Sequence, residues 1–461
     1  MFRYFIFYGG IALAVLTGLS NLGIIAIDDY LHGFANMIPA QAPLNAADVF
    51  GGIHPILPKL LLRALAQVPY SLGVADPFWQ LRIALGVLGA IVFLIQFYAA
   101  RVLFGLSREG DFAAFMLAFY FALPLFSTRP MIETVCMPLL TLSGAYAARY
   151  GRGDSRAYLL LALLFVVLAS LMRFQAGVCF FVLPCLVFWQ KRREDWGVFL
   201  LCVLGAFVLS GLPDVLYRGQ FHGQLREYIR YNMAFSGEHF GRMPFYVFFV
   251  LAFALTLPPA FLSRYQGMDW KKTYRGMGAV LGYVLVFLVA HSLSPHKEDR
   301  FIVPVLPLLL FSLVPMAVWL WDHGSVWRRW YFLGLNGFLL LLTCTNVPQK
   351  NLIGLAAWLS SHPEVRQVDY VNQSLIFHPQ AFLVDKRDWN SRGGWKEYEN
   401  TDCSRPVVVR SDISIDETWH SRFREITRFE PGWIERALVR ANPKNARRGP
   451  LVLYIPRSCG S

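Results

Sequence analysis

The sequence predicts an all-α membrane domain that crosses the bilayer many times, followed by a small α/β domain. Three observations lead to this fold class. Of the 461 residues 56% are hydrophobic and only 16% are charged, whereas soluble domains carry roughly 25% charged residues. Long apolar runs recur between residues 5 and 346, separated by short polar loops. From residue 347 onward the composition becomes that of an ordinary soluble domain.

The first apolar run, residues 5–27, is long enough to span a bilayer. It lacks the charged start and small-residue cleavage site of a signal peptide, so we expect a retained first helix. Residues 31–80 are mixed and predict a loop with short amphipathic helices in the interface. Ten further spans are predicted: 83–104, 112–126, 134–149, 158–172, 174–189, 197–213, 244–262, 277–293, 301–321 and 330–346. Arg173 interrupts one pair of spans, which predicts broken helices meeting at a polar site.

Loop charges set the orientation of these eleven spans. With the N-terminus in the cytoplasm, every cytoplasmic loop is basic, as the positive-inside rule requires. The basic residues of these loops are Arg108, Arg149, Arg152, Arg156, Lys191, Arg192, Arg193, Arg264, Lys271, Lys272, Arg275, Arg328 and Arg329. The opposite side receives Asp28, Asp29 and the segments 128–133, 214–243 and 296–300. It also receives the tail, because the number of spans is odd. We therefore expect a transmembrane domain over 1–346 and an extracytoplasmic domain over 347–461.

The tail alternates short apolar runs with turn residues. Strands are predicted at 368–371, 381–384, 406–409 and 451–455, and a helix at 414–428. Five of the seven cysteines lie in apolar runs and form no Cys/His cluster, so no metal site is predicted. Cys403 and Cys459 lie in the tail and can pair if it occupies an oxidising compartment.

The net charge of +13 raises the question of nucleic acid binding. The basic residues are spread over short loops between apolar runs, which is typical of membrane topology and of contact with lipid headgroups. No P-loop and no dinucleotide fingerprint occurs, so neither a nucleotide site nor a cofactor is predicted. We expect membrane lipid as a partner and no nucleic acid.

A basic stretch between the apolar runs 277–290 and 301–321 predicts a phosphate site. Arginine and lysine bind phosphate and stabilise charge that develops on a leaving phosphate. Four basic groups are expected on the extracytoplasmic side: His296, Lys297, Arg300 and Arg129. Glu298 and Glu133 would orient these cations, although salt bridges that tie helix ends together explain these two glutamates more simply.

Two other polar segments reach the same side. Asp28 and Asp29 follow the first span directly, and a carboxylate there can act as general base toward a hydroxyl. The alternative is a simple polar stop at the interface. Residues 231–246 combine aromatic side chains with Asn232, Glu238 and His239, a pattern that suits either a sugar or an interfacial belt. His239 is more simply a loop histidine.

These segments resemble those of a known family. His296-Lys-Glu-Asp-Arg-Phe-Ile-Val-Pro resembles the His-Lys-Glu-x-Arg-Phe segment of glycosyltransferase family 22, within the GT-C superfamily. The family's members are membrane mannosyltransferases that build N-glycan precursors and GPI anchors. Weaker matches occur in the right order at Asp28-Asp29, at Arg129 to Glu133 and at Asn232 to Tyr246. The resemblance covers roughly residues 1–320.

The resemblance implies a GT-C fold and an inverting transfer of mannose from dolichyl- or polyprenyl-phosphate mannose to a lipid-linked glycan, without a metal. Asp28 takes the place of the family's base with Asp29 beside it, and the basic stretch holds the donor phosphate. Asp29 replaces a usual Glu, and Phe240-Gly241 replaces Tyr-Gly. These departures concern the sugar and the acceptor more than the reaction.

Composition favours a bacterial inner-membrane protein with an undecaprenyl- or decaprenyl-phosphate donor; a eukaryotic protein would lie in the endoplasmic reticulum. Two alternatives remain open from the residues. One is a transporter or flippase for a lipid-linked glycan, although no internal repeat is seen. The other is a polymerase or ligase of surface polysaccharide.

Overall fold

The computed structural model describes residues 1–25, 33–37, 54–239, 241–256, 267–371, 378–392, 395–396, 398–410, 417–441 and 449–458. The chain divides into two compact units. The first comprises Met1–Thr17, Leu44–Leu61 and Gly86–Thr343, and the second comprises Gly18–Pro43, Leu62–Leu85 and Cys344–Ser461. Where the sequence predicts one boundary after residue 346, the second unit therefore also takes in two segments from the N-terminal part.

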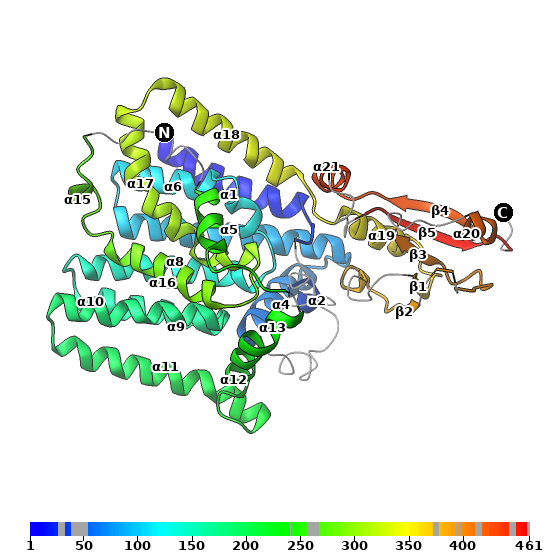
Figure 1. Ribbon diagram of the computed structural model, residues 1–461, viewed down its shortest axis with the longest axis horizontal. Coiled ribbons are helices and arrows are strands. Elements are labelled where there is room, and N and C mark those ends of the chain that lie inside the picture. Colours follow the sequence, from blue (N-terminus) through cyan, green and yellow to red (C-terminus); the bar gives the residue numbers. More distant parts are fainter. Residues whose placement is uncertain are drawn as a thin grey trace. The chain divides into compact units, whose positions relative to one another are not determined.

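The N-terminal three quarters of the chain is helical (Figure 1). From the N-terminus the first helices are α1 (Phe2–Ser20), α2 (Ala35–Met37), α4 (Ile56–Ser71) and α5 (Pro77–Phe104). Then come α6 (Arg108–Phe119), α7 (Leu123–Ser127), α8 (Ile132–Gly151), α9 (Arg156–Met172), η2 (Phe174–Phe181), α10 (Val182–Gln190) and α11 (Glu194–Arg218). The rest are α12 (Gly223–Arg230), η3 (Tyr231–Phe235), α13 (Ser236–His239), α14 (Val247–Leu255), α15 (Trp270–Thr273), α16 (Gly278–Leu293), η4 (Asp299–Val305), α17 (Leu306–His323) and α18 (Val326–Thr345).

The lengths of these helices agree with a membrane protein. Five described helical stretches are long and apolar enough to cross a bilayer: Phe2–Ser20, Pro77–Phe104, Glu194–Leu216, Asp299–His323 and Val326–Ser361. Shorter apolar helices are Arg156–Met172, Phe174–Gln190 and Gly278–Leu293. In Figure 1, α11 runs beside α9 and α10.

The predicted single span 112–126 is two helices in the structure. Pro124, in the first turn of α7, has no N–H to bond the carbonyl four residues earlier, so α6 ends at Phe119. A side chain of α18 forms hydrogen bonds with backbone groups at this break. Asn336 donates to Phe119 O at 2.7 Å and accepts from Phe121 N at 3.0 Å. Irregular backbone at membrane depth requires such partners.

The predicted break at Arg173 is confirmed. Arg173 has extended backbone angles (φ −150°, ψ 111°) that end α9, and the 3₁₀ helix η2 begins at the next residue. The break therefore places a guanidinium group at the end of two apolar helices.

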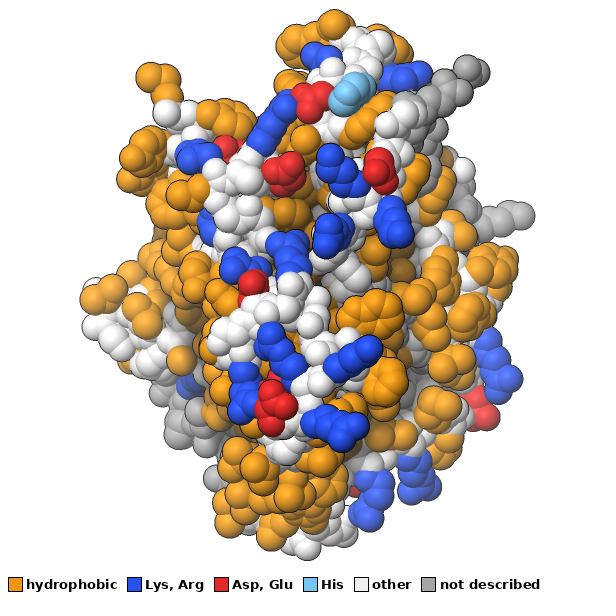
Figure 2. All heavy atoms as spheres, turned by 90° about the vertical axis from the view of Figure 1, so that its left-hand side faces the viewer, with side chains coloured by type: hydrophobic (Ala, Val, Ile, Leu, Met, Phe, Trp, Pro, Cys, Tyr) orange, Lys and Arg blue, Asp and Glu red, His pale blue; other side chains and the backbone are white. Residues whose placement is uncertain are grey.

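One face of the first unit carries the loops that the sequence predicts on the cytoplasmic side. Three contacts join them: Arg152 Nε donates to Gly276 O at 3.3 Å, Arg192 Nη1 to Asp154 O at 2.9 Å, and Arg108 Nη1 pairs with Asp322 at 2.6 Å. Figure 2 shows lysine and arginine side chains gathered across this face. Loops far apart in the sequence thus meet on one side, as the charge pattern predicts.

The second unit contains a five-stranded sheet in the order β2-β1-β3-β5-β4. Its strands are β1 (Gln367–Val371), β2 (Asp388–Arg392), β3 (Val407–Arg410), β4 (Phe423–Phe429) and β5 (Leu451–Pro456). Strands β2, β1 and β3 are parallel, and β5 pairs antiparallel with β3 and β4. Its helices are α19 (Lys350–Ser361), η6 (Gln380–Phe382), α20 (Glu417–Arg422) and α21 (Trp433–Ala441).

Two predictions for this domain are wrong. The segment 381–384 begins in η6, a 3₁₀ turn that buries Phe382, and is not a strand. The helix predicted over 414–428 is α20 followed directly by strand β4. Pairing of β4 with β5 supplies backbone bonds that the local helical pattern cannot reveal.

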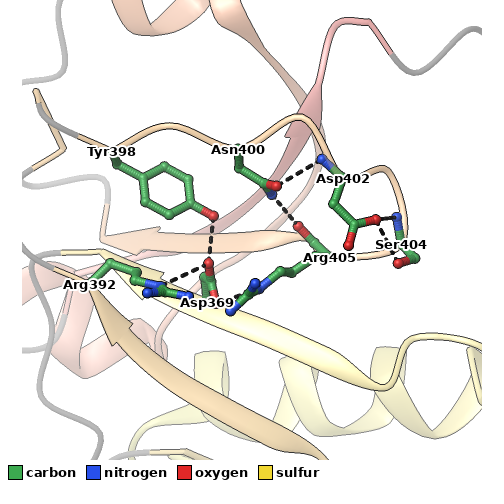
Figure 3. Close-up of polar contacts among 7 residues, drawn as sticks. All are labelled: Asp369, Arg392, Tyr398, Asn400, Asp402, Ser404 and Arg405. Carbon is green, nitrogen blue, oxygen red and sulfur yellow. Dashed lines mark hydrogen bonds and ion pairs between the residues drawn. The ribbon is translucent and has the colours of Figure 1, made fainter.

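A buried carboxylate connects the strands of this domain (Figure 3). Asp369, on β1, accepts hydrogen bonds from Tyr398 at 2.8 Å, Arg405 at 2.9 Å and Arg392 at 3.3 Å. The side chain of Asp369 is 3% exposed, so these donors replace its lost hydration. Cys403, in the same loop region, is disulfide-bonded, and Cys459 lies outside the described residues.

Candidate active site

A buried ion pair lies at the start of α8. Glu133 is in the first turn of this helix, and its carboxylate pairs with the guanidinium of Arg173 from the break between α9 and η2. Both side chains are 2% exposed. Buried charges in a membrane protein require a partner, so this pair fixes the ends of α8 and α9 against each other.

Arg129 lies in the turn before α8 and is fully buried. Its Nη2 donates to Thr128 Oγ1 at 3.3 Å. The sequence predicts that Glu133 orients the cations of this site, and the ion pair described for Glu133 is with Arg173. Arg173 is not among the site residues predicted from the sequence. Its position between two apolar runs was the feature that could have indicated it.

Phe301 joins this pair to the basic stretch. The guanidinium carbons of Arg173 and Arg300 lie 5.0 and 5.3 Å from the centre of its ring. The ring of His296 meets the same phenyl ring edge-on at 5.9 Å. Two cations over one aromatic ring are in cation–π range, so Phe301 holds together guanidinium groups from two separate elements.

Glu298 connects two of the predicted phosphate ligands. Its carboxylate oxygens contact His296 Nε2 at 2.8 Å and Arg300 Nε at 2.7 Å. Arg300 is 5% exposed, whereas the Glu298 side chain is 31% exposed. Glu298 therefore fixes the orientation of both basic groups at the start of η4.

Lys297 turns toward the backbone. Its Nζ donates to Met243 O at 3.0 Å and to Ser294 O at 2.6 Å, and the residue is 2% exposed. Burial lowers the pKa of Lys297. Two of its three N–H groups hold the neighbouring loop, which leaves one for another acceptor.

The aromatic segment 231–246 packs beside this basic stretch. Met243 N donates to Pro295 O at 3.0 Å, and a Cβ at Gly237 would lie 2.9 Å from Pro295 Cβ. Asn232, in the π-helical turn η3, donates to Tyr228 O at 2.9 Å, and Glu238 is exposed. The side chain of His239 is not among those described.

The predicted base is not described. Asp28 and Asp29 fall in residues 26–32, outside the part of the chain that the structure describes. Among the described residues, no three His, Cys, Asp or Glu side chains come together as a metal site would require. The described part of the site is therefore a set of basic groups, oriented by two glutamates, at one end of the helices.

Similarity to solved structures identifies the fold. ArnT from Cupriavidus metallidurans, solved with undecaprenyl phosphate and in the apo state, superimposes with a TM-score of 0.59 in both cases. The alignments cover 97% of both chains at 13% and 14% sequence identity. This likeness confirms the predicted GT-C fold with a small C-terminal domain.

Sequence comparison gives relatives with a common activity in their names. The chain is 29% identical over 136 residues to alpha-1,2-mannosyltransferase ALG9 of Mus musculus, over 26% of this chain and 22% of that protein. It is 26% identical over 239 residues to GPI mannosyltransferase 3 of Drosophila melanogaster, over 44% of this chain and 40% of that protein. The matches thus span less than half the length of these relatives. The pattern of the Alg9-like mannosyltransferase family matches residues 49–375, most of the chain, and the protein belongs to this family.

Proposed function

We propose that this protein is an integral-membrane inverting glycosyltransferase that moves mannose from a polyprenyl-phosphate donor to a lipid-linked glycan or glycolipid. Membership of the Alg9-like family and the names of its relatives support the activity. The undecaprenyl phosphate bound to ArnT supports the donor class. The reaction would occur on the extracytoplasmic face of a bacterial inner membrane.

One observation carries the proposal from the family to this site. Arg173 and Arg300 converge on Phe301 from different elements, with His296 on the same ring. Guanidinium groups bind phosphate in bidentate fashion, and two of them can share the oxygens of one monoester. A phosphate held there would leave as the sugar is transferred, and the fixed cations would stabilise the charge it gains.

The two glutamates orient the arginine side chains of the site. Glu133 and Glu298 hold Arg173 and Arg300 before any ligand arrives. Donors that are already oriented do not need to reorganise during the reaction, which is the main source of electrostatic catalysis. Arg173 and Arg300 are 2% and 5% exposed, so little water would reach them and each interaction with a phosphate would be stronger.

The chemical step needs a base, and Asp28 is the residue we assign to it, with Asp29 beside it. Asp28 would take the proton of the acceptor hydroxyl. The hydroxyl oxygen would then bond to the anomeric carbon from the face opposite the phosphate, and the bond to the phosphate oxygen would break with its electron pair. Anchoring donor and acceptor in one membrane would supply their proximity.

The substitution Arg300→Gln tests the phosphate role. Hydrogen bonds to charged groups are worth about 1.5–3 kcal/mol, so the KM for a polyprenyl-phosphate mannose should rise about 10- to 150-fold. The KM for the acceptor should stay near the wild-type value. Arg242→Gln is the matched control, because Arg242 is an exposed arginine in the neighbouring loop. Equal changes in both KM values, or equal effects of the two variants, would contradict the assignment.

A further inference from the structure

A cavity of about 1170 Å³ opens on the basic face of the first unit, the face shown in Figure 2. The ends of α5, α8, α10, α15 and α17 and the start of α6 line it. Helix α8 extends from the candidate active site to this cavity: Glu133 lies in its first turn, and Arg152 is the residue that caps its C-terminal end. At 1.5 Å per residue the two positions are roughly 28 Å apart, about the thickness of a bilayer core.

Arg152 is built into the wall of this cavity. Its Nη1 donates to Leu103 O at 2.8 Å and its Nε to Gly276 O at 3.3 Å. Gly276 has a positive φ of 81°, and a Cβ there would lie 2.6 Å from Arg152 Nε. Only glycine permits this backbone conformation and this close approach without strain. The guanidinium group of Arg152 is therefore held in place at the cavity.

Two further cations, Lys272 and Arg275, line the cavity. Lys272 and Arg275 are exposed, and neither side chain makes a hydrogen bond or an ion pair within the described part of the chain. Their backbone is ordered by the short helix α15, whose cap Asp269 accepts from Lys272 N at 3.0 Å. Because Lys272 and Arg275 carry charge of the same sign and line one cavity, a bound anion would reduce their repulsion.

The lining also contains two carboxylates, Glu109 and Asp322. Asp322 pairs with Arg108 Nη1 at 2.6 Å, outside the lining. With Arg108 included, the group of four cations and two carboxylates has a net charge of +2. The balance of charge at the cavity is therefore positive.

Most of the remaining lining is apolar or aromatic. Trp189 is 79% exposed at the end of α10, and Trp319 lies on α17 with the ring of His323 stacked 4.8 Å from it. Phe104 completes this side from the end of α5. Tryptophan side chains at helix ends are typical of the headgroup level of a bilayer. The cavity lining thus combines basic groups with apolar and aromatic side chains.

We propose that this cavity binds the phosphate headgroup of an anionic glycerophospholipid from the leaflet on the basic face. Arg152, Lys272 and Arg275 contact the phosphate, and the acyl chains follow the apolar and aromatic side chains of the lining. Basic pockets between the ends of transmembrane helices hold anionic lipids in this way. The site is separate from the candidate active site, and it does not depend on the proposed transfer reaction.

The test is lipid binding by the full-length protein in detergent, counted by native mass spectrometry. Titration with palmitoyl-oleoyl phosphatidylglycerol should show one tightly bound lipid. The double variant Lys272→Gln/Arg275→Gln should bind it about 30-fold more weakly, because each basic residue contributes about fivefold. Lys191→Gln/Arg193→Gln is the matched control, since it removes one exposed lysine and one exposed arginine from the same face but not from the cavity.

The outcomes separate the sources of the phosphate. Weaker binding in the first double variant alone supports the proposal. Equal weakening in both double variants would overturn it, because general surface charge would then explain the binding. Equal binding of phosphatidylcholine, or displacement of the lipid by millimolar inorganic phosphate, would also overturn the assignment to an anionic lipid.

Discussion

Removal of the charge on Glu133 is the most direct test of the buried network. In Glu133→Gln, the guanidinium of Arg173 would remain buried at 2% exposure without its carboxylate. Breaking a buried pair from one side typically destabilises a protein by about 3–5 kcal/mol. Large domains lose about 2 °C of Tm per kcal/mol, so a decrease on the order of 6–10 °C is expected.

The measurement is thermal unfolding of detergent-purified protein, followed by the amount of monodisperse protein left after heating. All variants must be heated at one rate, because unfolding of membrane proteins is often irreversible. Surface charge is controlled by Glu227→Gln, whose carboxylate pairs with Arg218 but is 54% exposed. Exposed pairs contribute about 0–1 kcal/mol, so this control should change Tm by about 2 °C at most.

The double variant Glu133→Gln/Arg173→Gln decides between a pair and two independent effects. If the two side chains stabilise each other, the double variant should lose less stability than the sum of the losses in the two single variants, Glu133→Gln and Arg173→Gln. Additive losses would refute the pairing. A Tm for Glu133→Gln equal to that of the wild type would refute the burial on which the magnitude depends.

Four further predictions concern residues of both units. Asp28→Asn should abolish sugar transfer while the protein stays folded in the membrane; measurable transfer of radiolabelled sugar would place the base elsewhere. Lys297→Ala should weaken use of the donor more than use of the acceptor in steady-state kinetics, and equal losses would argue against a phosphate role. Asp369→Asn should destabilise the C-terminal domain by about 3–5 kcal/mol, because Asp369 accepts from two arginines and a tyrosine, and pulse proteolysis would measure the loss. Cys403→Ser should cost about 2–5 kcal/mol in the same assay, and wild-type resistance to protease would contradict this.

The sequence predicts which loops lie on the same face better than it predicts the contacts between those loops. Loop charge places the basic loops on one side, and the structure joins Arg152 to Gly276 and Arg192 to Asp154 there. This part is predictable because the bilayer imposes one rule on every loop. The break at Arg173 was predictable for a similar reason, because a charged arginine between two apolar runs is costly in a bilayer unless it lies at a polar site.

The partners of these side chains were not predictable. Nothing local in the sequence pairs Glu133 with Arg173, which is 40 residues away. The role of Lys297 as a donor to two backbone carbonyls depends on where residue 243 lies in space. Strand β4 was missed for the same reason, because its bonds come from β5 and local propensity for strands depends on such neighbours.

The contacts of the two glutamates bear on which carboxylate acts as base. Glu133 pairs with Arg173, and Glu298 contacts His296 and Arg300, so we expect these carboxylates to orient cations rather than to accept a proton from a hydroxyl. Each holds cations in position, and protonation of either would release them. A site with this division of roles needs its base from a separate segment, and we therefore expect it from Asp28. The two halves would act on opposite sides of the sugar, with the cations on the leaving phosphate and the carboxylate on the attacking hydroxyl, as inversion at the anomeric carbon requires.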